Sequence, residues 1–138
     1  MEVTGSLAAV LFFSSDQCDT DIVVRLCDLY PDGRSILIAE GGCRLGVIKH
    51  ETGIQSDHKP GEVARVDVDL WATSFVFAKG HAIRVSVSSS SYPRYEKNPN
   101  VGLFGTNRGC CKVGKNTLHM GPQYPSRVVL PCVRTVGG

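Results

Sequence analysis

The feature that most constrains this chain is a strict alternation of apolar and polar residues over short segments. In the segment 63–70, four apolar residues alternate with Arg65, Asp67 and Asp69, and the segment 83–88 repeats the pattern with three aliphatic residues. Because side chains alternate between opposite faces in an extended chain, each segment has one apolar face and one polar face. We therefore expect two strands of an antiparallel sandwich, with the aliphatic residues of both segments buried.

The rest of the chain shows almost no helical periodicity, and short β-branched or aromatic runs are separated by Gly, Pro, Asp and Asn. Residues 22–30 and 35–39 flank Pro31, Asp32 and Gly33, a combination that favours a tight turn and therefore a long hairpin. Further strands are predicted at 7–13, 74–78 and 127–133, and irregular stretches at 46–61 and 88–121. The pattern predicts an all-β sandwich of about eight strands, at the spacing typical of a jelly roll.

The bulk properties limit both the size and the partners of this fold. A length of 138 residues suits one domain, and 42% hydrophobic with 20% charged residues is typical of a globular protein. The net charge is only +2, and Lys and Arg are scattered, so neither nucleic acid nor an anionic membrane is an expected partner. The first apolar run follows Glu2 rather than basic residues, which is unlike a signal peptide. We expect a single domain, 1–138, in the cytoplasm.

The six cysteines are expected to be free thiols, because the chain shows neither an export signal nor a C-x-x-C pair. Cys27, Cys43 and Cys132 lie within apolar strand patterns and are predicted to be small core residues. The adjacent Cys110 and Cys111 leave a redox or metal feature open as a less favoured alternative.

Three groups of segments carry a family resemblance. They are 19–21 with 26–34; 60–63 with 68–74, 77, 80–81 and 83–85; and 88–90 with 92–95, 98–100, 125–127 and 130–131. In this order and spacing they resemble, over nearly the whole chain, the C-terminal jelly-roll domain of the X-Pro dipeptidyl-peptidase, cocaine esterase and α-amino-acid ester hydrolase family. The resemblance implies a β-sandwich like a galactose-binding domain. Family members enter this module through an additional strand before the segment matching 2–5, and we expect that strand to be missing here.

The resemblance also implies how activity is divided between domains. Family enzymes cleave esters or peptide bonds with a Ser-Asp-His triad on a preceding α/β-hydrolase domain, and the present sequence holds no G-x-S-x-G nucleophile motif. We expect a module with no catalytic residue, metal or cofactor of its own and with a structural or protein-interaction role. Two alternatives remain open: a carbohydrate or small-ligand binding module, and a fragment of a serine hydrolase that acts with a separate catalytic domain in trans.

Five residues are candidates for contact with a ligand or partner. Trp71 has a ring large enough to stack on a sugar or aromatic ligand, although burial or packing at a sheet edge is an equally good explanation. Tyr92, Arg94, Tyr95 and Asn98 lie together in a predicted loop, where aromatic and guanidinium groups can anchor a partner. The competing interpretation is that the two tyrosines hold the loop against the sandwich.

Other polar clusters have structural explanations that we favour. Three aspartates between residues 16 and 21 offer oxygen ligands for a hard cation, but they lack the spacing of an EF-hand loop, so turn or capping roles are expected. The serines at 88–91 with His81 or His119 form a conceivable nucleophile pair. A hydrogen-bonded turn role for His81 is the favoured prediction.

Self-association is a further expectation. A sheet without its first strand exposes unpaired N–H and C=O groups, which proteins usually cover or pair. A two-fold homodimer through this edge is therefore predicted.

Overall fold

The computed structural model describes residues 1–50, 53–55, 58–102 and 110–133. Within these ranges the regular elements are strands, apart from one 3₁₀ turn at Leu45–Val47, which confirms the all-β prediction. The strands are β1 (Glu2–Ser15), β2 (Asp21–Leu29), β3 (Ser35–Arg44), β4 (Ile48–His50), β5 (Gly53–Gln55), β6 (Ala64–Val76), β7 (Ala82–Ser88), β8 (Asn116–His119) and β9 (Arg127–Val129).

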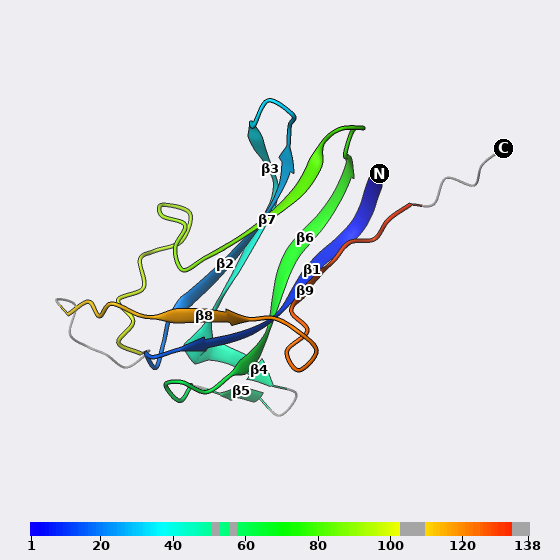
Figure 1. Ribbon diagram of the computed structural model, residues 1–138. Helices are drawn as coiled ribbons and strands as arrows, with labels where there is room; N and C mark the ends of the chain where they lie inside the picture. Colours follow the sequence, from blue (N-terminus) through cyan, green and yellow to red (C-terminus); the bar gives the residue numbers. More distant parts are fainter. Residues whose placement is uncertain (51–52, 56–57, 103–109, 134–138) are drawn as a thin grey trace.

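Two antiparallel sheets form the sandwich (Figure 1). One sheet has the order β6-β1-β8, with β9 also paired to β1, and the other has the order β3-β2-β7. A small hairpin of β4 and β5 lies within the stretch that the sequence pattern predicts to be irregular. The predicted hairpin around Pro31, Asp32 and Gly33 is present, and the Gly33 φ of 89° is the positive value that this turn requires.

The apolar core lies between the two sheets, and the alternation in β6 builds it as predicted. The register of β1 against β6 places Ala9 opposite Val68 and Leu11 opposite Val66, and these side chains are almost fully buried. From β2, residues Ile22, Val24 and Leu26 face the same core. Burying one such aliphatic side chain contributes about 1.5–3 kcal/mol, so the alternating pattern alone accounts for much of the driving force.

The two sheets converge along one side, where β3 meets β6. A Cβ atom added to Gly41 of β3 would overlap the carbonyl oxygen of Asp69 and lie 2.9 Å from its carbonyl carbon. Only glycine, which lacks a Cβ atom, permits this approach. Directly beyond it, β6 is irregular: Trp71 has a φ of 66°, and the register with β1 shifts between Ser6 and Ala8.

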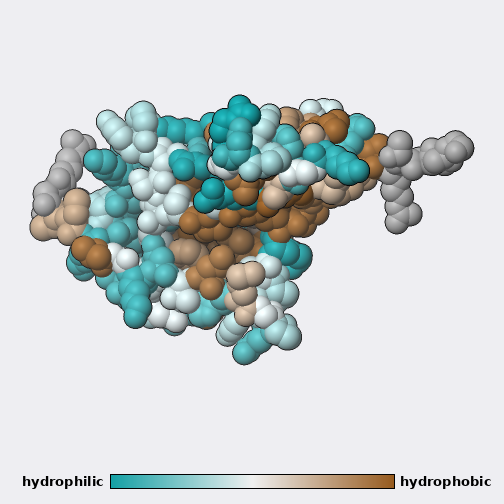
Figure 2. All heavy atoms as spheres, turned by 45° about the horizontal axis from the view of Figure 1, so that its top comes forward, coloured by the Kyte–Doolittle hydropathy of each residue, from teal (hydrophilic) through white to brown (hydrophobic). Residues whose placement is uncertain are grey.

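At the Ala82 end of β7 the core-facing side is not covered, which contradicts the predicted burial of Ile83 and Val85, whereas Val87 packs against the core as predicted. The register places Val85 opposite Leu26 and Ile83 opposite Asp28, on the side of the sheet that faces the core. Val85 and Ile83 nevertheless remain 42% and 38% exposed, and Ile36, which flanks Asp28 on β3, remains 45% exposed. We call Ile36, Ile83 and Val85 the apolar strip. Figure 2, which brings this end of the sandwich forward, shows apolar side chains gathered between polar rims.

Several other expectations are corrected. The predicted strand at 74–78 is the end of the long β6, and the predicted strand at 127–133 is reduced to β9 and one bridge between Val3 and Cys132. Cys132 is exposed rather than part of the core, whereas Cys27 is buried and Cys43 half-buried; all six cysteines are free thiols. Within the described residues, no helix is long and apolar enough to cross a membrane.

Candidate functional site

A buried carboxylate holds the segment after β7 against the outer face of the β3-β2-β7 sheet. Glu40 of β3, whose side chain is 3% exposed, forms ion pairs with Arg25 of β2 and with Arg94 of the loop, the second at 3.1 Å. The Ser91 hydroxyl lies 3.2 Å from Glu40 Oε2 and accepts a 2.6 Å hydrogen bond from Arg25 Nη2. Glu40 is therefore fully engaged inside the protein, as a buried carboxylate must be.

The aromatic residues of the same loop take two different positions. Tyr95 packs on β3, since a Cβ atom at Gly42 would lie 3.2 Å from its ring. Tyr92 is 67% exposed, and the Lys97 ammonium lies 5.1 Å from its ring centroid. The packing of Tyr95 anchors the loop, while Tyr92 stays largely exposed beside Lys97.

Asn98 connects the loop to two aspartates at the start of β2. Its amide donates to Asp19 Oδ2 at 3.1 Å and to Asp21 Oδ1 at 2.8 Å. Asp19 also accepts the Gly46 N–H at 2.9 Å, and Arg44 Nε lies 3.1 Å from Asp21. These carboxylates are satisfied by protein donors, as the turn and capping interpretation requires.

Asp16 is held in the same way. It accepts the Lys115 N–H at 2.8 Å, and this backbone hydrogen bond is the main cause that lowers its pKa. Among the described residues, no group of three or more His, Cys, Asp or Glu side chains is placed to hold a metal ion.

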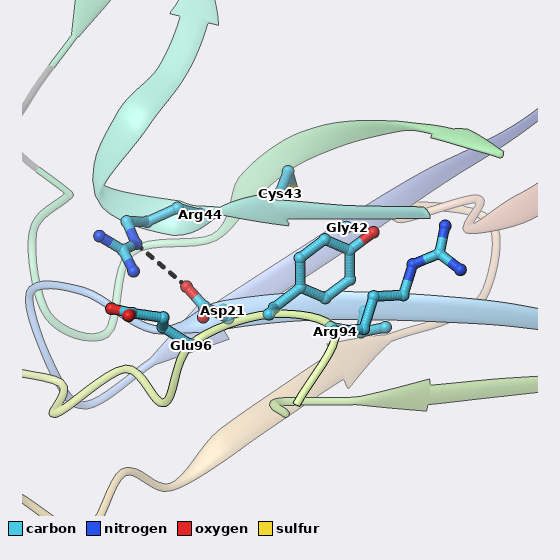
Figure 3. A pocket seen from close by; sticks show the side chains of 8 residues that line it. Asp21, Gly42, Cys43, Arg44, Arg94 and Glu96 are labelled. Carbon is cyan, nitrogen blue, oxygen red and sulfur yellow. Dashed lines mark hydrogen bonds and ion pairs between the residues drawn. The ribbon is translucent and has the colours of Figure 1, made fainter. Parts of the chain in front are cut away.

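Two pockets flank the loop. The first, with a volume of about 360 Å³, is lined by Asp21, Val23, Gly42, Cys43, Arg44, Arg94, Tyr95 and Glu96. Figure 3 shows Arg44 turned toward Asp21, while Arg94 extends away in the opposite direction. Burial, reinforced by the charges of Asp21 and Asp67, raises the pKa of the Cys43 thiol to about 12. Cys43 is therefore protonated at neutral pH and is not a nucleophile.

The second pocket, which we call the arginine pocket, has a volume of about 520 Å³. It is lined by Arg25, Cys27, Ser35, Leu37, Glu40, Arg84, Ser86, Ser91, Tyr92, Pro93 and Arg94. Three guanidinium groups thus face one carboxylate, and the carboxylate is already paired with two of them. The local charge is positive.

Among the side chains that the structure describes, neither His81 nor His119 pairs with the serines at 88–91. His81 Nδ1 bonds to the buried Asp28 at 2.8 Å, which agrees with its predicted turn role, and its ring lies 4.1 Å from that of Tyr30. His119 Nε2 bonds to Ser14 at 2.8 Å. In the described part of the chain, no carboxylate forms a hydrogen bond with His119, so this Ser–His pair lacks the third group that orients a catalytic base.

Of the five candidate contact residues, four lie in the loop over one sheet, and Trp71 lies apart from them. Trp71 is 67% exposed on β6 and lines neither pocket. Sequence reasoning missed Arg25, Glu40 and Arg84. One signal for Arg25 was available, because it is the one charged residue in the apolar run 22–27.

A family model, curated proteins and solved structures match this chain over most of its length. The family model described as the X-Pro dipeptidyl-peptidase C-terminal non-catalytic domain matches residues 1–129. The cocaine esterase of Rhodococcus sp. (strain MB1 Bresler) is 40% identical over 97% of this chain and 24% of its own length. A putative serine esterase of Mycobacterium bovis is 28% identical over 97% of this chain and 22% of its own length. The chain therefore spans about a quarter of the length of these relatives.

Two solved structures share the fold. An aminopeptidase from the marine sediment archaeon Thaumarchaeota archaeon superposes with a TM-score of 0.84 at 23% identity, over 94% of this chain and 23% of that one. An α-amino acid ester hydrolase superposes with a TM-score of 0.82 at 22% identity, over the same shares of the two chains.

Proposed function

Since this chain belongs to the family of X-Pro dipeptidyl-peptidase C-terminal non-catalytic domains, we propose that it packs through its apolar strip on the α/β-hydrolase domain of a serine esterase or peptidase. In this role it supports the catalytic domain and contributes no reacting group.

The incomplete cover of β7 is the observation that carries this proposal. Ile36, Ile83 and Val85 lie on the core-facing side of their sheet and still expose more than a third of their surface. Clustered apolar exposure of this kind marks a contact surface, whereas isolated exposed apolar residues are normal. Because each of these side chains is already more than half buried, covering the exposed remainder would contribute roughly 0.6–1.3 kcal/mol, about 40% of the value for full burial.

The lengths of the relatives indicate what covers the apolar strip. The relatives are about four times as long as the segment that this chain matches; one is named a cocaine esterase and another a putative serine esterase. Their remaining three quarters must contain the catalytic serine if the matching quarter is non-catalytic, as the family description states. A module without a complete triad among its described residues acts by contact with such a domain.

A chimaera tests the proposal. The matching quarter of the Rhodococcus cocaine esterase is replaced by this chain, and hydrolysis of a p-nitrophenyl ester and the melting temperature are measured. We expect an active chimaera that the double substitution Ile83→Asp and Val85→Asp inactivates or destabilises by several degrees. The matched control is Val113→Asp, at a residue that is 94% exposed outside the strip.

The isolated chain supplies the second arm. Both variants should leave its circular dichroism unchanged, because the substituted residues are exposed, and none of the proteins should hydrolyse the ester. A chimaera indifferent to Asp at both strip positions would contradict the proposal, as would ester turnover by the isolated chain that a serine-directed reagent abolishes. Light scattering on the isolated chain separately tests the predicted homodimer.

A further inference from the structure

We propose that the arginine pocket binds a carboxylate attached to a short apolar body, such as a medium-chain fatty acid anion. This site lies on the outer face of the β3-β2-β7 sheet, opposite to the apolar strip, and does not depend on the docking proposal.

The arginine pocket carries a net positive charge. Glu40 is the one carboxylate among its lining residues, and ion pairs with Arg25 and Arg94 consume that negative charge. Arg84 adds a third guanidinium, and Lys97 adds a further cation beside Tyr92 at the rim. An anion that enters the pocket meets an excess of positive charge, carried by the exposed Arg84 and Arg94 beside the half-buried Arg25.

Two of the guanidinium groups in the pocket have N–H donors without an acceptor in the described part of the chain. Arg84 lies opposite Cys27 in the register of β2 and β7, and Ser86 lies opposite Arg25, so the two guanidinium groups project from neighbouring positions of one face. Within the described ranges, the Arg84 guanidinium forms neither an ion pair nor a hydrogen bond, and the terminal nitrogens of Arg94 are likewise unused. A planar guanidinium with two parallel N–H groups matches a carboxylate in a bidentate pair.

Part of the pocket lining is apolar. Cys27 is 8% exposed and forms part of the wall, Leu37 is 50% exposed, and Tyr92 presents its ring with Pro93 beside it. An inorganic anion would leave these surfaces in water, whereas a short alkyl chain would cover them. The volume of about 520 Å³ lies within the roughly 300–1,000 Å³ usual for small-ligand sites.

The test titrates the ¹⁵N-labelled chain with hexanoate and follows amide chemical shifts by NMR. Saturable shifts are expected at residues lining the arginine pocket. Hexanamide, which has the same shape without the charge, should cause none of them, and acetate, which lacks the alkyl chain, should bind at least about tenfold more weakly.

Two variants identify the responsible residues. Arg84→Gln should weaken hexanoate binding by about tenfold or more, the loss expected for a charge-assisted hydrogen bond. Leu37→Ala should lower the affinity for hexanoate to a value close to that for acetate. The matched control is Arg65→Gln, at an exposed arginine of the other sheet that pairs with Asp67.

A third variant guards against a change in folding. Ser86→Glu places a carboxylate beside Arg25 and Arg84, and it should block hexanoate while circular dichroism stays unchanged. The proposal is overturned if hexanoate causes no saturable shifts in the wild-type chain, if hexanamide binds equally well, or if folded Arg84→Gln and Ser86→Glu proteins bind hexanoate like the wild type.

Discussion

Gly41→Ala is predicted to destabilise the fold, although the same change usually stabilises a strand. The φ of Gly41 is not in the positive region, so alanine fits the backbone, and relief of glycine entropy alone would contribute about 0.4–1 kcal/mol of stability. The added Cβ atom, however, would overlap the Asp69 carbonyl oxygen and lie 3.2 Å from Leu70 Cδ2. Ordinary carbon contacts are about 3.5–4.0 Å, so β3 and β6 must separate.

The magnitude follows from that separation. At the Asp69 carbonyl carbon the distance must grow from 2.9 Å by at least roughly 0.6–1 Å, and the overlapping carbonyl oxygen must move farther; a gap of this size forfeits at least about a quarter to a half of each dispersion contact across it. Overpacking of this kind costs about 1–3 kcal/mol, and the obstacle here is backbone, which cannot rotate away. Taking the upper part of that range and subtracting the gain from removing a glycine, we expect a net loss of about 2 kcal/mol in the free energy of unfolding.

Urea unfolding monitored by far-UV circular dichroism measures this loss. Fluorescence is a poor probe, because the single tryptophan is 67% exposed already in the folded protein. The matched control is Gly42→Ala, whose Cβ atom would lie 3.2 Å from the Tyr95 ring, a side chain that can shift, and 3.5 Å from the Ile22 carbonyl oxygen, an ordinary contact. If Gly41→Ala is as stable as Gly42→Ala or as the wild type, the close approach of β3 to β6 is wrong.

Three further predictions concern individual side chains. Burial lowers the pKa of His58 below 6.5, so the unfolded chain takes up the proton first, and wild-type stability should fall as the pH drops through 6.5. Urea midpoints at pH 7.5 and 5.5 should show a smaller fall in His58→Gln, and an equal fall would contradict the assignment. Asp19→Ala leaves the buried Gly46 N–H without its acceptor and should cost about 2–3 kcal/mol by the same assay; a cost below about 0.5 kcal/mol would refute that role. Iodoacetamide at pH 8, read by mass spectrometry, should spare Cys27 and Cys43 in the folded protein and label the exposed thiols; early labelling of Cys43 would contradict its raised pKa. The exposed thiols are Cys18, Cys110, Cys111 and Cys132.

Local patterns predicted the strands well because their causes are local. The alternation in 63–70 and the turn residues between 30 and 35 act over a few neighbouring positions, and the structure contains both elements. The same alternation in β7 predicted the packing of Val87 against the core but not the exposure of the two other aliphatic residues. A period of two specifies which side chains share a face, but not whether another sheet covers that face, so the exposure of Ile83 and Val85 was not accessible from the sequence.

The site was predictable only in part for a similar reason. Tyr92, Arg94, Tyr95 and Asn98 are neighbours in sequence, so their common position in one loop needed no knowledge of the fold. The charges that surround them come from Arg25 on β2, together with Glu40 and Arg84 on β3 and β7, and only strand pairing brings those together. Whether the four loop residues and Trp71 contact a ligand or partner stays a prediction.

The close contact between Gly41 of β3 and Asp69 of β6 fixes the spacing of the two sheets along one edge of the sandwich. At the opposite edge of the β3-β2-β7 sheet, Ile83 and Val85 of β7 remain exposed. A neighbouring protein that packs on those two side chains would meet a surface whose position relative to the other sheet depends on the contact at Gly41. Residues that never touch the neighbour, Gly41 first among them, would therefore decide how well it fits.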